Sequence, residues 1–167
     1  MRAALAVLVA ATAAGWAGWL ATAPAVASAG SARPAVWAAA VTYRAGAVIC
    51  HQQDARSLHV RGVRMPVCAR CFGLYAGAAA GAFVAAAWVF GARRPVTLPL
   101  ARWRLAALAC GLPTLGAWAA EHLAGVVVPG AARALLAVPL GAAVAVIVTM
   151  WAGGAAFDDT APASKLD

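Results

Sequence analysis

The sequence is poor in charged residues and has very few acidic ones. Only 11% of its 167 residues are charged, and Asp and Glu together number 5. A typical soluble domain carries about 25% charged residues, so the composition argues against a soluble globular protein. The hydrophobic share of 65% and the mean hydropathy of +0.83 instead indicate an integral membrane protein, too short to hold a separate soluble domain.

Other absences narrow the function. Four cysteines are too few for a disulfide scaffold, and the chain shows no internal repeat. The apolar runs contain no series of charged residues that would define an ion pathway, which argues against transport. A net charge of +8 would suggest nucleic acid in a soluble protein, but here the arginines lie at the ends of apolar runs, where they anchor helices. We therefore exclude nucleic acid and expect a lipid bilayer as the partner; no feature specifies a protein partner or an oligomeric state.

Four apolar runs approach or exceed the roughly 20 residues that a membrane-spanning helix needs. The fold class is therefore an all-α integral membrane bundle of about four transmembrane helices, with a short interfacial helix before a loop rich in Cys and His. Residues 23–34 contain two prolines and predict a connecting loop. The expected single membrane domain, 1–157, comprises spans over about 3–21, 72–91, 105–128 and 132–151, the short helix over 36–49 and the Cys/His loop over 50–71, followed by a polar tail over 158–167.

The first apolar run has a competing interpretation. A short basic start, an apolar stretch and the small residues of Ala25–Ser28 also resemble a cleavable signal peptide. Trp16 and Trp19, at the end of the run, are typical of an interfacial anchor, and for this reason we favour a retained helix. In the second span, Gly73, Gly77 and Gly81 recur at four-residue steps and predict a face for close helix packing.

The loops on either side of the second span both carry arginines. Residues 92–104 hold four arginines and no acid, whereas the Cys/His loop includes Asp54. The positive-inside rule favours the acid-free loop in the cytoplasm, which places the Cys/His loop on the extracytoplasmic side of the cell membrane. The chain crosses back in the third span, so Glu121 and His122 are expected on the face of the cysteines, with Cys110 roughly 20 Å away.

Reactive side chains are concentrated in ICHQQDARSLHVRGVRMPVCARCFGLYAG, residues 49–77. Cys68 and Cys71 form a CxxC at the start of a helix, a spacing common in structural zinc sites. Cys50 and His51 complete a tetrahedral Cys₃His set if the loop folds back, and zinc is the expected ion. Cys50 and His51 are adjacent in the chain, and two adjacent residues bind one metal ion with difficulty. Another residue is therefore expected as a substitute ligand for one of them. The expected ligands are Cys50, His51, Cys68 and Cys71; the supporting residues are Arg56 and Arg70 for charge balance, His59, Glu121 and His122 as substitutes, and Tyr75.

Two alternatives use the same residues. A CxxC at a helix N-terminus near arginines has the setting that lowers a thiol pKa, so the protein would be a thiol–disulfide oxidoreductase with Cys50 as a third thiol. In the second alternative the cysteines only staple a loop of a structural membrane protein. The residues alone do not specify an enzymatic activity.

Residues 43–77 resemble a family of small multi-pass membrane proteins of unknown function from bacteria and archaea. The family signature is CHQ, an Arg-Ser pair, and a VCARC-type segment that runs into G-x-Y-x-G. Members usually carry Asp-Gly early in the third span, where this chain has LGAWAAEHL instead; either Glu121 stands in for that acid or its function is lost. The resemblance implies a conserved site without implying an activity. The matching positions are Cys50, His51, Gln52, Arg56, Ser57, Cys68, Arg70, Cys71, Gly73, Tyr75 and Gly77.

Overall fold

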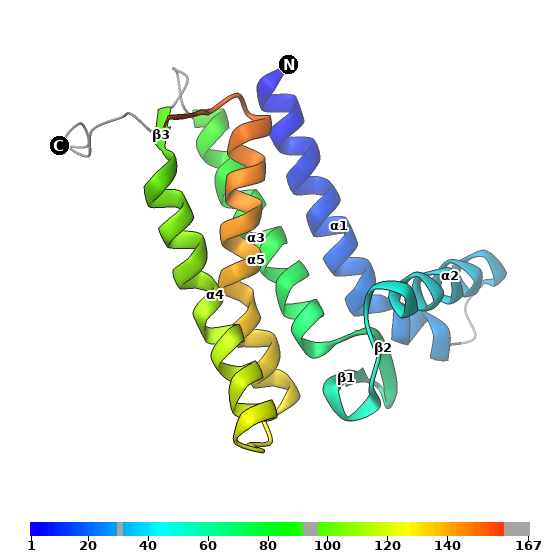
Figure 1. The fold of residues 1–167 in the computed structure, drawn as a ribbon. Helices are drawn as coiled ribbons and strands as arrows, with labels where there is room; N and C mark the ends of the chain where they lie inside the picture. The colour runs from blue at the N-terminus through cyan, green and yellow to red at the C-terminus, as the bar shows by residue number, and fades with distance from the viewer. Residues whose placement is uncertain (30–31, 92–96, 159–167) are drawn as a thin grey trace.

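The computed structural model describes residues 1–29, 32–91 and 97–158 and is mostly helical (Figure 1). Its helices are α1 (Arg2–Ser28), α2 (Arg33–Ile49), α3 (Ala69–Gly91), α4 (Leu100–Leu123) and α5 (Gly130–Ala152). A short 3₁₀ helix, η1 (Asp54–Arg56), and a hairpin of β1 (Ser57–Val60) and β2 (Val63–Cys68) connect α2 to α3. At the other end of the bundle, β3 (Thr97–Pro99) pairs in parallel with β4 (Ala156–Asp158).

Three of the described helices are long and apolar enough to cross a membrane: α1, α3 and α5. The helix α4 has 24 residues, which corresponds to about 36 Å. Arg102 and Arg104 near its start and Glu121 near its end lower its hydropathy, and it is not among the three. The expectation of a helical membrane bundle is confirmed, and the count of four spans remains a prediction.

The helices α3 and α5 lie in parallel and in close contact. A Cβ atom placed on Gly73, Gly77 or Gly81 would lie 2.0–2.3 Å from a backbone oxygen of α5. The oxygens belong to Ala134, Val138 and Ala142, so the contact advances by the same step along both helices. The glycine face predicted from the sequence is therefore a packing face, as in other membrane helix pairs with small residues at four-residue steps.

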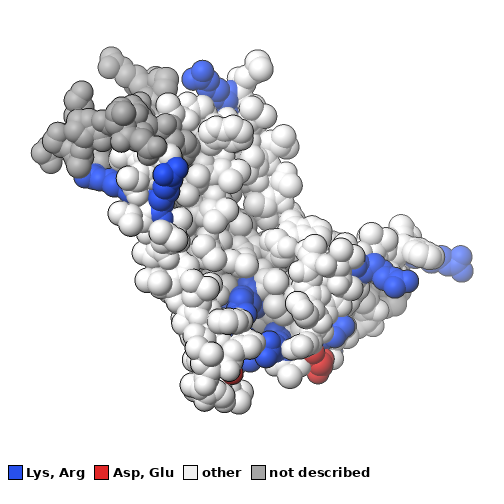
Figure 2. All heavy atoms as spheres, in the orientation of Figure 1, with Lys and Arg blue, Asp and Glu red and all other residues white. Residues whose placement is uncertain are grey.

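Small side chains fill the bundle and large apolar ones point outward. Ala6, Ala10, Ala82, Ala86 and Ala145 form a buried cluster. Figure 2 shows arginines near the two ends of the molecule, with uncharged surface between them. This distribution suits a lipid environment, where outward-facing apolar side chains carry no penalty. Exposed large apolar residues include Leu8, Phe83, Trp88, Phe90, Leu108, Leu112, Leu135 and Val148.

Several element boundaries differ from the sequence-based expectation. Most of the predicted loop over 23–34 is helical, because α1 continues through the buried Pro24 to Ser28 and α2 begins at Arg33. The predicted third span over 105–128 is α4, which begins at Leu100 and ends at Leu123. The polar tail predicted over 158–167 lies almost wholly outside the described residues.

The short helix before the Cys/His loop projects sideways from the end of α1. In Figure 1, α2 runs at a steep angle to α1 beside the hairpin. Trp19 of α1 donates a hydrogen bond from Nε1 to Oγ1 of Thr42, 2.7 Å away, and fixes α2 against α1. Trp37 and Val41 are well exposed on α2. A helix that leaves the bundle at a steep angle and exposes apolar residues is typical of an interfacial helix.

Candidate metal centre

The Cys/His segment, expected as an irregular loop, is a β-hairpin that places its cysteines together. Arg61 and Gly62 have φ values of +53° and +78°, the pattern of a two-residue type I′ turn. The hairpin pairs Val60 with Val63 and, beyond a bulge, Ser57 with Cys68. The Arg-Gly dipeptide between short apolar stretches is the sequence signal that could have revealed it.

Gln52 holds the hairpin against α2. Its side-chain Nε2 donates to the carbonyl oxygens of Tyr43, at 2.8 Å, and Pro66, at 2.7 Å. Arg64 donates from Nη1 to the Gln52 carbonyl. Gln52 is buried and adopts φ +44°, which is unusual for a residue other than glycine, and these bonds offset the conformational cost. The result is a sharp turn just after Cys50 and His51.

Gly46 gives the hairpin room to approach α2. A Cβ at this position would lie 2.2 Å from the Pro66 carbonyl oxygen and 2.7 Å from Nε2 of Gln52. The hydroxyl of Tyr43 donates to the carbonyl of Arg64 on the same side. Burial raises the pKa of Tyr43 above its usual value, so this hydroxyl keeps its proton.

The three clustered cysteines converge as the sequence predicted. The sulfur atoms of Cys50, Cys68 and Cys71 all lie within 4.8 Å of one another. The Cys68 amide donates a hydrogen bond to Sγ of Cys50 at 3.2 Å. Cys50 is buried, and the other two are half-buried at the start of α3. Three thiols in this arrangement can hold one thiophilic metal ion.

The neighbouring thiols change the acidity of Cys68. A hydrogen bond from the Cys71 thiol is the main cause that lowers the pKa of Cys68 to about 5, against the opposing effect of burial. Cys68 is therefore largely a thiolate at neutral pH. A thiolate is the form that binds a metal and also the form that attacks a disulfide.

Apolar side chains of α1 and α3 surround the inner side of the cysteines. Leu20 and Val67 are fully buried beside Cys50. Tyr75 packs in the same cluster and meets the ring of Trp16 edge-on, with ring centroids 6.1 Å apart. Tyr75 thus connects the cysteine cluster to α1, and the packing excludes water from one side of the thiols.

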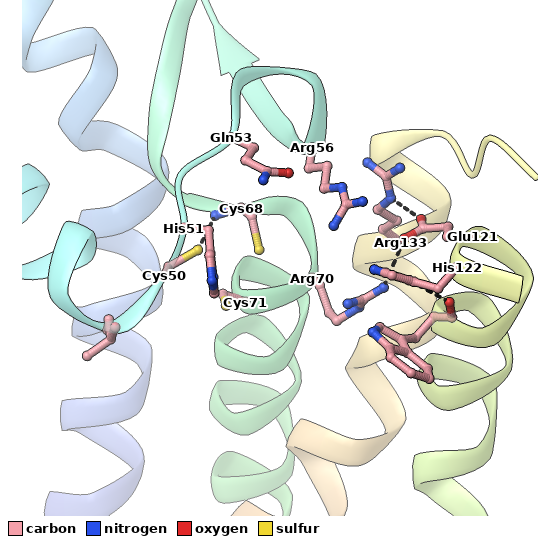
Figure 3. A pocket seen from close by; sticks show the side chains of 12 residues that line it. Cys50, His51, Gln53, Arg56, Cys68, Arg70, Cys71, Glu121, His122 and Arg133 are labelled. Carbon is pink, nitrogen blue, oxygen red and sulfur yellow. Dashed lines mark hydrogen bonds and ion pairs between the residues drawn. The ribbon is translucent and has the colours of Figure 1, made fainter. Parts of the chain in front are cut away.

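A buried ion-pair cluster faces the cysteines from the other side (Figure 3). Glu121 accepts from Nη2 of Arg70 at 3.3 Å and from Nε of Arg133. The Glu121 and Arg133 side chains are 5% and 8% exposed. Arg133 also donates from Nη1 to the carbonyl of Ala55 at 3.3 Å, which links α5 to the 3₁₀ helix. The cluster therefore joins α3, α4, α5 and the Cys/His segment.

One cavity of about 500 Å³ contains both groups. The thiols line one part, and Arg56, Arg70, Arg133 and Glu121 line another. In Figure 3 the Arg56 side chain points into the space between them. The cavity also includes His51, Gln53, Trp118 and His122.

The structure separates the predicted site residues into those that share the cavity and those that do not. His51 lines it but lies outside the close group of three sulfurs. His122 lines it with Nδ1 at 2.9 Å from the Trp118 carbonyl and its ring stacked on Trp118. His59 instead pairs with Asp54 at 3.0 Å on the exposed side of the hairpin. Cys110 is not part of the group of three.

Arg133 was not among the predicted site residues. It lies one turn into the last apolar run. A membrane-anchoring arginine, whose side chain extends toward the membrane surface, occupies the same kind of position, so the sequence does not distinguish it from a site residue. Its pairing with Glu121, twelve residues upstream, depends on the α4–α5 turn. The expected spans over 105–128 and 132–151 meet at this turn, but the sequence did not indicate that the two side chains pair.

These observations define a helical membrane protein with a cluster of three thiols at one end of its bundle. The family described as "Predicted membrane protein (DUF2085)" matches residues 50–147, more than half of the chain. The chain therefore belongs to this family of membrane proteins, as its motif predicted.

One protein of similar sequence matches a shorter part of the chain. The uncharacterized protein MJ1492 of Methanocaldococcus jannaschii is 45% identical over 42 residues, which is 25% of this chain. The matched part is 27% of that protein, so the likeness covers about a quarter of each. No solved structure matches the chain.

Proposed function

We propose that the protein binds one zinc ion at a face of the membrane through Cys50, Cys68 and Cys71. The observation that supports this most is the convergence of their three sulfur atoms within 4.8 Å. Zn–S bonds of about 2.3 Å in a tetrahedral site place the sulfurs about 3.8 Å apart, so small side-chain rotations suffice. The thiolate character of Cys68 also favours a metal.

His51 is the proposed fourth ligand. It lines the same cavity and follows Cys50 directly, and its exposed ring has room to turn toward the sulfurs. A Cys₃His set is a common closed zinc site. The basic residues Arg56 and Arg70 would balance the net charge of −1 that three thiolates and one Zn²⁺ leave.

A thiol–disulfide oxidoreductase is the second candidate. The lowered pKa of Cys68 and the hydrogen bond from Cys71 favour it, since a stabilised thiolate beside a second thiol is the arrangement of redox pairs. In that case Cys68 would attack a disulfide of a partner, forming a mixed disulfide and releasing one partner thiolate. Cys71 or Cys50 would then attack Cys68, releasing the second partner thiolate and leaving a disulfide within this chain.

Elemental analysis and thiol counting separate the two functions. The protein is purified in detergent without added metal or reductant. The zinc site predicts about one equivalent of zinc per chain, with all three thiols masked from a thiol reagent until a chelator is added. The redox site predicts no metal and a disulfide that a dithiol reverses. Metal-free protein with a reversible disulfide would overturn the zinc proposal.

We further propose that α4 is the fourth membrane span. The helices α3 and α5 run in parallel, so the chain must return between them across the same thickness. The helix α4 runs the opposite way beside them and is long enough to do so.

The proposed location is the cell membrane, with the cysteine face outside. Arg56, Arg70 and Arg133 line the cavity instead of anchoring lipid, which leaves the acid-free arginines of residues 92–104 as the stronger cytoplasmic signal. Labelling with a membrane-impermeant biotin reagent tests this: a cysteine placed at Arg61 should react in intact cells. Reaction only after lysis would reverse the orientation.

A further inference from the structure

The cavity beside the cysteines has more positive charge than its own residues neutralise. Three guanidinium groups line it, from Arg56, Arg70 and Arg133. Glu121 is the one carboxylate among the lining residues, and both of its oxygens are engaged by Arg70 and Arg133. These four side chains leave a net charge of +2 on the cavity wall. Even a zinc ion with three thiolates, at −1, would leave a surplus.

Arg56 is the one of these three guanidinium groups that makes no hydrogen bond or ion pair within the described structure, and it is only half-exposed. Its charge acts on Glu121 only through space. Its side chain points into the cavity toward the Arg133–Glu121 pair (Figure 3). The Nε atom of Arg70 is also buried with no hydrogen-bond partner. A buried donor without a partner costs free energy, and like charges held together add to it.

We infer that this cavity binds a small oxyanion of the phosphate or carboxylate type, held by Arg56 and Arg70. Guanidinium groups bind such anions through charge-assisted hydrogen bonds. Arg56 has all of its donors to spare, and Arg70 has Nη1, since its Nη2 is engaged by Glu121. The cavity volume of about 500 Å³ lies in the range of small-molecule sites and exceeds what an inorganic anion fills. The rest of the bound molecule would then lie toward the three thiols.

This inference deepens the proposed function by naming the ligand class of the same cavity, and it fails independently of it. The guanidiniums attract an anion with or without zinc, so zinc content and anion binding are separate measurements. Calorimetric titration with inorganic phosphate, on full-length protein in neutral detergent at constant ionic strength, measures the second. Zinc in the same samples is measured by elemental analysis.

Two variants test which charges matter. We expect saturable binding of about one phosphate per chain, weakened at least tenfold by Arg56→Gln. Arg44→Gln removes the same charge from an exposed position on α2 and should leave the affinity unchanged. Absence of saturable binding, or equal weakening by both variants, would overturn the inference, because it would indicate only a diffuse attraction of anions to a basic face.

A measurement on the wild-type protein tests the same inference without depending on whether a variant folds. Phenylglyoxal modifies accessible guanidiniums, and phosphate should slow the modification of Arg56 at least several-fold without affecting Arg44. Equal rates with and without phosphate would also overturn the inference.

Phosphate binding in nanodiscs then identifies the source of the anion. Weaker phosphate binding in phosphatidylglycerol than in phosphatidylcholine indicates that a lipid headgroup occupies the cavity. Equal binding in the two lipids indicates a soluble anion.

Discussion

The backbone amide of Cys68 donates a hydrogen bond to Sγ of Cys50, 3.2 Å away and 18 positions earlier in the chain. This contact joins the two halves of the Cys/His segment at the base of the hairpin. The placement of the ligands therefore depends on how the hairpin is held, and Gln52 is the residue that holds it.

Gln52→Ala should loosen the site without touching a ligand. It removes the hydrogen bonds to the carbonyls of Tyr43 and Pro66, of which the bond to Pro66 is buried. The expected loss of stability is about 1–3 kcal/mol, with weaker zinc binding. Thermal unfolding in detergent and a zinc competition titration measure both. Gln53→Ala is the matched control, because no side-chain hydrogen bond of Gln53 is found in the described structure, and an equal effect of both changes would refute the role of Gln52.

Gly77→Ala should separate α3 from α5. The added Cβ would lie 2.1 Å from the Val138 carbonyl oxygen, so one helix must move. Overpacking of this kind typically costs about 1–3 kcal/mol. Gly18→Ala in α1 adds the same methyl group where no atom lies within 4 Å, and it should be neutral or slightly stabilising. Similar unfolding temperatures for the two variants would show that the α3–α5 contact is less close than described.

Glu121→Gln should destabilise the fold at the cavity. It keeps the shape of the side chain but leaves Arg70 and Arg133 without a countercharge, and the loss of one partner from a buried pair costs about 3 kcal/mol. Asp54→Asn is the control, since its pair with His59 is exposed and should contribute at most about 1 kcal/mol. If Glu121→Gln unfolds at the same temperature as the wild type, the ion pairs of Glu121 do not stabilise the fold.

Phosphate binding should strengthen in Glu121→Gln, because the cavity then gains positive charge.

The reactivity of Cys68 should depend on pH in a way that ordinary thiols do not. Its pKa is lowered to about 5, so in metal-free protein the thiolate persists as the pH falls from 8 to 6 and is lost only near pH 5. Alkylation of Cys68 by iodoacetamide, followed by peptide mass spectrometry, should change little between pH 8 and pH 6. In the unfolded chain, where a thiol has a pKa near 8.5, the rate should fall almost a hundredfold over the same interval. The same fall in the folded protein would show that the Cys71 hydrogen bond does not form.

The sequence predicted the helical membrane bundle and the pairing of Cys68 with Cys71 because both follow from local patterns. Long apolar runs specify helices in a bilayer, and a CxxC at a helix start places two thiols together whatever surrounds them. The glycine face of α3 was also predicted, because the four-residue spacing of Gly73, Gly77 and Gly81 places them on one face of a helix. In each case neighbours in the chain determine the outcome.

Features that depend on distant residues were not predictable in the same way. The sequence predicts a loop in place of the hairpin, because the strands are short and apolar and polar residues alternate only weakly along them. The partner of Glu121 depends on the α4–α5 turn, and Arg133 has the sequence signature of an ordinary membrane anchor. The position of His59, turned away toward Asp54, follows from the hairpin register. Sequence spacing does not determine this register when a bulge intervenes.

The zinc content of purified Cys68→Ser, set beside that of Cys110→Ser, tests the central claim most directly. Both changes remove one sulfur, but only Cys68 belongs to the group of three. The account predicts about one equivalent of zinc per chain in the wild type and in Cys110→Ser, and a loss of most of it in Cys68→Ser. Folded wild-type protein that binds no zinc when the ion is supplied, or equal zinc in all three proteins, would contradict the account.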